Sequence, residues 1–114
     1  MSTISTHVLN TATGRPGAGM VVVFDSVNPD GNLEEISRAP ANADGRVVSL
    51  LPAGKSLDKG NYRLTFDTSG YFSALGLRCF YPKVEIFFEI TDSTEHYHIP
   101  LLVSPYSYST YRGS

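Results

Sequence analysis

Three histidines are the side chains of this sequence best suited to acid–base chemistry, because an imidazole titrates near neutral pH. They are His7, His96 and His98. Side chains of a strand alternate between its two faces, so His96 and His98 lie on the same face of their strand. His7 lies on the same face of its own strand as Ser5 and Leu9. Two imidazoles on one face resemble half of a zinc site, but a metal needs further ligands. One exposed and one half-buried structural histidine is the plainer interpretation, and the role of His96 stays open.

A cation and a polar segment could complete such chemistry. The sequence ends on Tyr111-Arg112-Gly113-Ser114, an aromatic ring, a guanidinium, a glycine and a hydroxyl. We expect a segment with these groups to dock against something rather than extend into water. Arg46 follows an Asp44-Gly45 dipeptide compatible with a type I′ turn, and alone it indicates a solvated charge at a strand start. Ser114 lacks the Gly-x-Ser-x-Gly context of a nucleophilic serine.

Short strands separated by turns must position these groups. Residues 60–67 and 83–90 alternate cleanly, which puts Tyr62, Leu64 and Phe66 on one face of the first segment. Residues 71–76 are expected to form one short helix that Gly76 ends. About seven or eight strands indicate an all-β fold, a two-sheet antiparallel sandwich with one short helix. The expected strands cover residues 6–9, 19–25, 34–39, 46–51, 60–67, 83–90, 96–101 and 106–111.

Length and composition favour a single domain over residues 1–114 and exclude several partners. The chain has 41% hydrophobic residues, nine basic and eleven acidic residues, and a net charge of −2. Without a Lys/Arg cluster, neither nucleic acid nor a membrane surface is an expected partner. The first residues lack the pattern of a signal peptide, so a cytoplasmic location is expected. Cys79 is the single cysteine and is expected to be a small buried apolar side chain.

Three motifs, in this order, resemble the signatures of the 5-hydroxyisourate hydrolases, also called transthyretin-related proteins. They are Thr6-His7-Val8-Leu9-Asn10-Thr11-Ala12-Thr13-Gly14-Arg15-Pro16, His96-Tyr97-His98-Ile99-Pro100-Leu101-Leu102-Val103-Ser104-Pro105 and Tyr111-Arg112-Gly113-Ser114. The last motif separates these hydrolases from transthyretin, a hormone carrier of the same fold. Segments 42–46, 60–64 and 71–76 also match, so the resemblance runs essentially end to end. It departs at Lys83, where the family usually has an acidic residue.

The resemblance implies a transthyretin-like sandwich and a homotetramer whose sites lie in the channel where dimers meet. It implies hydrolysis of 5-hydroxyisourate, a step of urate degradation, which opens a ring amide and yields 2-oxo-4-hydroxy-4-carboxy-5-ureidoimidazoline. No metal or organic cofactor is expected, and a peroxisomal location is less expected than a cytoplasmic one. The implied site residues are His7, Arg46, His98, Tyr111, Arg112, Gly113 and Ser114.

The chemistry of these groups fits that reaction. His7 together with His98 is expected to activate water and transfer protons, in an order that stays open. Arg46 offers a planar cation for the ring carbonyl and the oxyanion that forms on it. Tyr111 is expected to hold the flat heterocycle, and Ser114 to orient water or a histidine. The alternatives are a transthyretin-like carrier of a small aromatic ligand and, less favoured, a metal-binding or structural sandwich.

Overall fold

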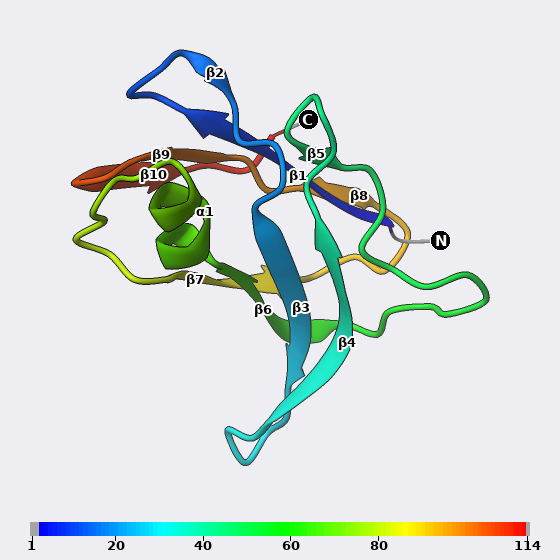
Figure 1. Cartoon of the computed structure of the whole chain (residues 1–114). Coiled ribbons are helices and arrows are strands. Elements are labelled where there is room, and N and C mark those ends of the chain that lie inside the picture. Colours follow the sequence, from blue (N-terminus) through cyan, green and yellow to red (C-terminus); the bar gives the residue numbers. More distant parts are fainter. Residues whose placement is uncertain (1–2, 114) are drawn as a thin grey trace.

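Two β-sheets pack face to face in the computed structural model, which describes residues 3–113 (Figure 1). The first sheet contains β1 (Thr3–Asn10), β2 (Arg15–Pro16), β5 (Arg46–Val47), β8 (His96–His98), β9 (Leu101–Ser104) and β10 (Ser107–Thr110). The second sheet has the order β4 (Leu33–Pro40), β3 (Val21–Val27), β6 (Gly60–Phe66), β7 (Val84–Ile90). One helix, α1 (Thr68–Ala74), follows β6. The predicted all-β sandwich with one short helix is confirmed.

Strand pairing departs from the antiparallel expectation along β1. This strand pairs in parallel with β8 and β9, whereas it pairs antiparallel with β2 and β5. Parallel strands need a long crossover connection, and the whole second sheet lies between β1 and β8 in the sequence. Pro100, which has no backbone N–H, stands between β8 and β9, so the predicted strand 96–101 is divided there.

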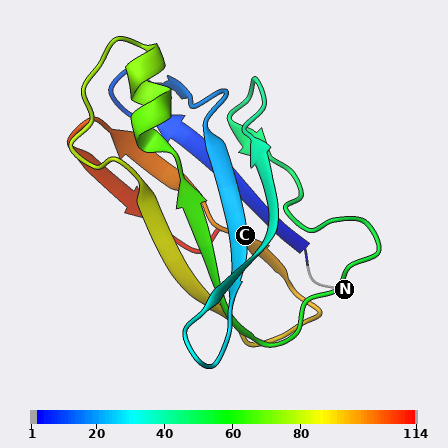
Figure 2. The same ribbon diagram turned by 60° about the horizontal axis from the view of Figure 1, so that its bottom comes forward.

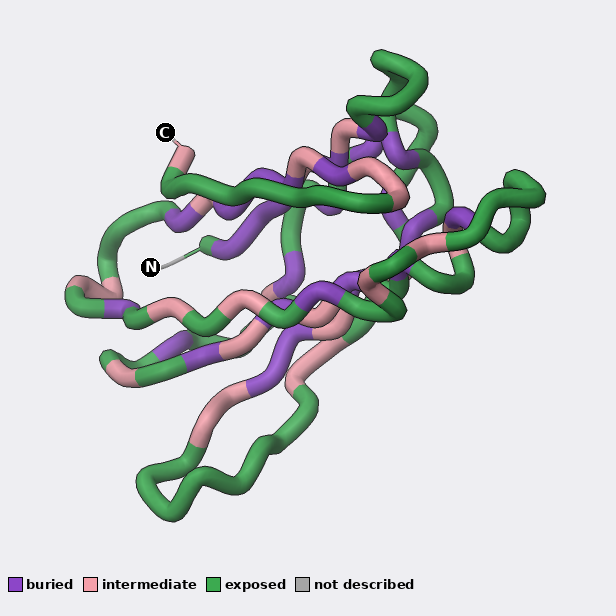
Figure 3. The backbone as a smooth tube through the Cα atoms, turned by 90° about the vertical axis from the view of Figure 1, so that its left-hand side faces the viewer, coloured by how far each residue is buried: buried purple, intermediate pink, exposed green. Residues whose placement is uncertain are grey.

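Alternating side chains build the core between the two sheets. Figure 3 shows buried positions alternating with more exposed ones along the strands of both layers. Leu64 and Phe66 are fully buried and Tyr62 nearly so, as their spacing predicts. Ile4 and Val8 of β1 are also fully buried. Each such side chain contributes about 1.5–3 kcal/mol to folding by its burial. A slip of one residue in β1 would exchange its two faces, so this burial fixes which side chains point outward.

The helix begins earlier than the sequence analysis expected. Asp67 caps its N-terminus by accepting a hydrogen bond from Gly70 N–H at 3.0 Å. Phe72 is fully buried and anchors the helix to the core, while Gly76, with φ of 74°, follows the helix end. Figure 2 shows α1 at the end of the strands opposite the β3–β4 turn. The expected helix 71–76 was therefore placed about one turn late, because Asp67 was assigned to the preceding strand.

Two smaller expectations were wrong in extent. The strand expected over 46–51 is only Arg46–Val47, and Val48 is 73% exposed beyond it. Cys79 is half-buried rather than buried, and its thiol donates to Tyr81 O at 3.0 Å. Within residues 3–113, no helix is both long and apolar enough to cross a membrane.

Candidate active site

The central strand β1 brings the N-terminal histidine between two distant segments. Val8 N–H donates to Gly45 O at 2.7 Å, and Ile99 N–H donates to Ser5 O at 3.0 Å. Backbone groups of even and odd positions in a strand point to opposite edges, so β5 and β8 lie on opposite sides of β1. His7 stands opposite Arg46 in one pair and Ser5 stands opposite His98 in the other.

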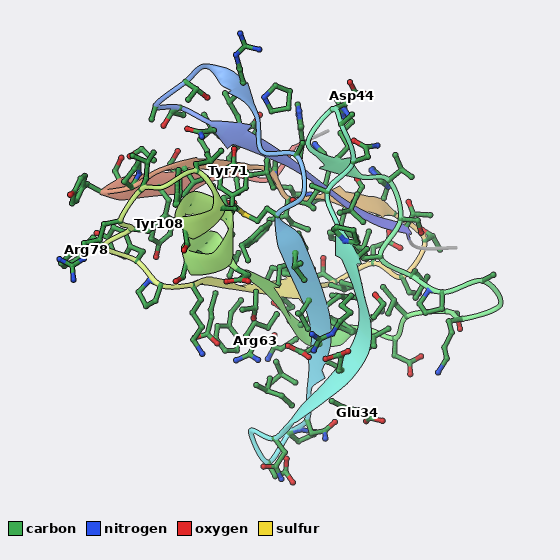
Figure 4. The ribbon with its side chains drawn as sticks, viewed as in Figure 1. Glu34, Asp44, Arg63, Tyr71, Arg78 and Tyr108 are labelled. Atoms are coloured by element: carbon green, nitrogen blue, oxygen red, sulfur yellow. The ribbon has the colours of Figure 1, made fainter. Side chains whose placement is uncertain are left out.

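A tight turn before β5 places Arg46 beside β1. Asn42 Oδ1 accepts hydrogen bonds from Asp44 N–H at 2.9 Å and from Arg46 N–H at 3.0 Å. Gly45 has φ of 76°, and a Cβ there would lie 2.4 Å from Val8 O, so the turn packs directly on β1. Asp44 lies at the tip of this turn in Figure 4. Of Asp44 and Gly45, only Gly45 has a positive φ, whereas a type I′ turn needs a positive φ at both, so the type I′ expectation is wrong.

The same turn determines which ring nitrogen of His7 carries the hydrogen. The half-buried ring of His7 has Nε2 3.1 Å from Asp44 O. A carbonyl oxygen can only accept, so Nε2 carries the hydrogen in this contact. In the neutral ring Nδ1 is then the basic nitrogen. His7 therefore offers one defined nitrogen for proton transfer.

His98 is held in place by its ring and by its backbone. Its Nδ1 lies 2.8 Å from Ser5 Oγ, and its carbonyl accepts a hydrogen bond from Gly113 N–H at 2.8 Å. Burial lowers the pKa of His98 below the ordinary 6.5, and electrostatic interactions with His96, Arg46 and His7 lower it further. His98 is therefore neutral at pH 7, the state in which an imidazole can accept a proton.

A hollow of about 240 Å³ lies on the outer face of the first sheet at these residues. His7 is the register neighbour of Arg46 but does not line the hollow. The two imidazoles of β8 are stacked, with ring centroids 6.3 Å apart. Within residues 3–113, no group of three or more His, Cys, Asp or Glu side chains is arranged to hold a metal ion. The lining residues are Ser5, Thr6, Arg46, Val47, Val48, His96 and His98.

Among the described residues, no carboxylate neutralises the positive charge of Arg46. Across residues 3–113, no carboxylate lies within 4.0 Å of its guanidinium. By contrast, Arg63 on the second sheet pairs with Asp25 at 3.0 Å, and Arg112 pairs with Glu95 at 2.5 Å. A guanidinium without a partner at the wall of a hollow can bind a carbonyl oxygen or an anion.

The C-terminal segment divides between two places. Gly113 lies against His98, whereas Tyr111 and Arg112 line a second hollow of about 240 Å³. There the Arg112 guanidinium lies 4.7 Å from the centre of the Tyr97 ring. Ser114 lies outside the described residues. A single chain thus brings His7, Arg46, His98 and Gly113 together. It places the side chains of Tyr111 and Arg112 at the second hollow.

The arrangement has counterparts in known proteins. Residues 4–113 match the family model described as the HIUase/Transthyretin family. The chain belongs to this family. A 5-hydroxyisourate hydrolase of Mus musculus is 42% identical over 114 residues, covering 99% of this chain and 96% of the relative. One of Ralstonia nicotianae is 42% identical over 120 residues and covers all of both chains.

Solved structures of the HIUase/Transthyretin fold superpose over nearly the whole chain. The 5-hydroxyisourate hydrolase of Klebsiella pneumoniae has a TM-score of 0.87 at 34% identity, covering 100% of both chains. Sea bream transthyretin in complex with thyroxine has a TM-score of 0.89 at 26% identity, covering 96% of this chain and 93% of that one. The transthyretin-like sandwich implied by the motifs is confirmed.

Sequence reasoning did not find Ser5 in this candidate site. Ser5 Oγ lies between the imidazoles of His98 and His96, at 2.8 Å and 3.1 Å. Strand alternation placed Ser5 on the face of His7, which was the available signal. The pairing of Ser5 with His98 joins residues 93 positions apart, and no local pattern reports such a pairing.

Replacing Gly113 by alanine is expected to lower kcat/KM about a hundredfold in this member of the family, because misplacing a reacting group by about 1 Å costs that much. The added Cβ would lie 2.5 Å from His98 Cδ2, so the ring must move. Steady-state kinetics and circular dichroism measure activity and folding. The control is Gly76→Ala, where the added Cβ meets no atom within 4 Å; its positive φ strains the backbone locally, but activity should persist. Unchanged activity in Gly113→Ala would contradict the prediction.

Proposed function

We propose that this chain acts, as a single domain, as a 5-hydroxyisourate hydrolase that opens a ring amide of its substrate. One observation carries the proposal: an imidazole whose lowered pKa keeps it neutral lines the same hollow as a guanidinium that has no carboxylate within 4.0 Å among residues 3–113. Amide hydrolysis needs a base for the attacking water and a cation for the oxyanion. Relatives named 5-hydroxyisourate hydrolase are 40–42% identical to this chain over most of its length, which supports the proposed substrate.

The reaction follows from these two groups. The neutral His98 accepts a proton from water while the water oxygen attacks the ring carbonyl. The carbonyl oxygen becomes an oxyanion, which the forked guanidinium of Arg46 stabilises. The C–N bond then breaks, and the proton passes from the imidazolium to the departing ring nitrogen. The products are a ureido group and a carboxyl group, which loses its remaining proton to solvent, and the base is regenerated. His7, with Nδ1 as its free nitrogen, is the second group proposed for proton transfer.

A homotetramer with sites where dimers meet is part of the proposal. The hollow lies on an outer sheet face, and its volume falls below the roughly 300–1,000 Å³ of typical ligand pockets. A second protomer across this face would enclose the substrate and is proposed to bring Tyr111, Arg112 and Ser114 to the site. Dilution kinetics with light scattering test this, and a fully active monomer would refute it.

A cytoplasmic location is proposed with it, and cell fractionation tests that location.

The proposed activity has a direct test. The protein is mixed with urate and urate oxidase, and the ultraviolet absorbance of the unstable intermediate is followed. A hydrolase accelerates its decay in proportion to protein concentration. A carrier, the function suggested by the transthyretin–thyroxine complex among the structural neighbours, would bind a small aromatic ligand and leave the decay rate unchanged. That outcome would replace the hydrolase proposal with the carrier.

Activity is expected to persist below pH 6.5 and to fall only at more acidic pH. The base must be neutral, and burial together with neighbouring positive charges lowers the pKa of His98 below 6.5. The acidic limb of kcat/KM therefore lies below the ordinary histidine pKa. A pH–rate profile of fresh substrate in buffers of constant ionic strength measures it. A limb at or above pH 6.5 would contradict the assignment of His98 as the base.

A further inference from the structure

We propose that Ser5 is a positioning residue that holds His98 with a hydrogen on Nδ1 and a free lone pair on Nε2. This inference rests on the proposed hydrolase function and deepens it. Ser5 is only 8% exposed and its hydroxyl contacts two imidazoles, His98 Nδ1 at 2.8 Å and His96 Nε2 at 3.1 Å. The other nitrogen of His96, Nδ1, is hydrogen-bonded to Thr3 Oγ1. Four side chains thus form one continuous chain of hydrogen bonds.

The hydrogens of this chain can be counted. A hydroxyl has one hydrogen to donate and two lone pairs, and a neutral imidazole has one N–H and one lone pair. If His98 donates from Nδ1 to Ser5 Oγ, then Ser5 donates to His96 Nε2, and His96 donates from Nδ1 to Thr3 Oγ1. Every contact then holds one hydrogen. The reverse order also satisfies the contacts, but it puts the hydrogen of His98 on Nε2 and leaves no lone pair facing away from Ser5.

A general base must use the nitrogen that Ser5 does not contact. Nδ1 is occupied by the serine hydroxyl, so the water proton has to reach Nε2. The order of hydrogen bonds in which His98 donates from Nδ1 is therefore the one compatible with catalysis. In other hydrolases a third group orients the base by accepting a hydrogen bond from it. Ser5 has this role for His98, and its accepting oxygen is uncharged.

The charges around His98 explain why a neutral partner suffices. The groups that face it from β1, β5 and β8 are His7, Arg46 and His96, and each one lowers the pKa of His98. A hydrogen bond between the His98 ring and the backbone of Ser5 acts in the opposite direction and favours the protonated ring. The uncharged Ser5 hydroxyl therefore orients the imidazole, while the guanidinium of Arg46 favours the neutral base.

The test compares Ser5→Ala with Ser5→Thr, which keeps the hydroxyl. Loss of one neutral hydrogen bond is expected to lower kcat of Ser5→Ala about tenfold and to leave KM within about twofold. Ser5→Thr restores most of kcat. The matched control is Ser26→Ala in β3 of the second sheet, which keeps wild-type kinetics.

A spectroscopic readout separates this inference from the function it rests on. Nitrogen-15 NMR of the intact protein above the pKa of His98 is expected to show Nδ1 protonated in the wild type and Nε2 protonated in Ser5→Ala. A wild type with the hydrogen on Nε2, or equal tautomers and equal kcat in both proteins, would overturn the role of Ser5. Failure of the wild type to accelerate substrate decay would instead overturn the hydrolase function, and the NMR result would stand independently.

Discussion

Replacing His98 by asparagine is expected to lower kcat about 10²–10⁴-fold, the usual cost of removing a general base. Asparagine keeps a polar atom near the position of Nδ1, so a contact with Ser5 can persist. It has no atom at the position of Nε2, so water loses its proton acceptor. The backbone bond between Gly113 N–H and the carbonyl of residue 98 does not depend on the side chain. The fold is therefore expected to be unchanged.

Stopped-flow measurement of substrate decay gives kcat for this variant, and circular dichroism with light scattering reports its fold and assembly. Because the imidazole is absent, the acidic limb assigned to His98 should also disappear from the pH–rate profile. Turnover within about threefold of the wild type would remove His98 from the mechanism, since the expected loss is at least about a hundredfold.

Replacing Arg46 by alanine is expected to lower kcat about 10²–10³-fold, the cost of removing one donor to an oxyanion. The turn before β5 is held by the backbone N–H of residue 46 and by the side chain of Asn42, so it should survive the change. Arg46 also lowers the pKa of His98. Without the guanidinium this pKa rises, and the acidic limb of activity moves to higher pH.

The matched control is Arg78→Ala, at an exposed position that Figure 4 shows projecting from the loop between α1 and β7. It removes the same charge without touching the hollow and should retain wild-type kinetics. Arg46→Lys separates charge from shape, because an ammonium keeps the charge but not the forked geometry. Wild-type kcat and an unmoved acidic limb in Arg46→Ala would refute its proposed role.

Local patterns in the sequence were sufficient for most of the fold. Alternation in residues 60–67 predicted the buried face of β6, because strand geometry turns every second side chain to the same side. The start of α1 and the length of β5 were less well predicted. Asp67 can end a strand or cap a helix, and only its hydrogen bond to Gly70 decides between them. Val48 continues a β-branched run, yet it lies beyond the pairing with β1.

The sequence by itself determined the types of the reactive groups, the face of each strand that carries them and the family, through motifs that extend along the chain. These properties depend on residue order and on the two-residue period of a strand. Only the tertiary structure decided which nitrogen of His7 carries the hydrogen, that Ser5 contacts His98, and that Gly113 packs against that ring. Such contacts depend on the register between strands far apart in the sequence, and core packing of the whole sandwich sets that register.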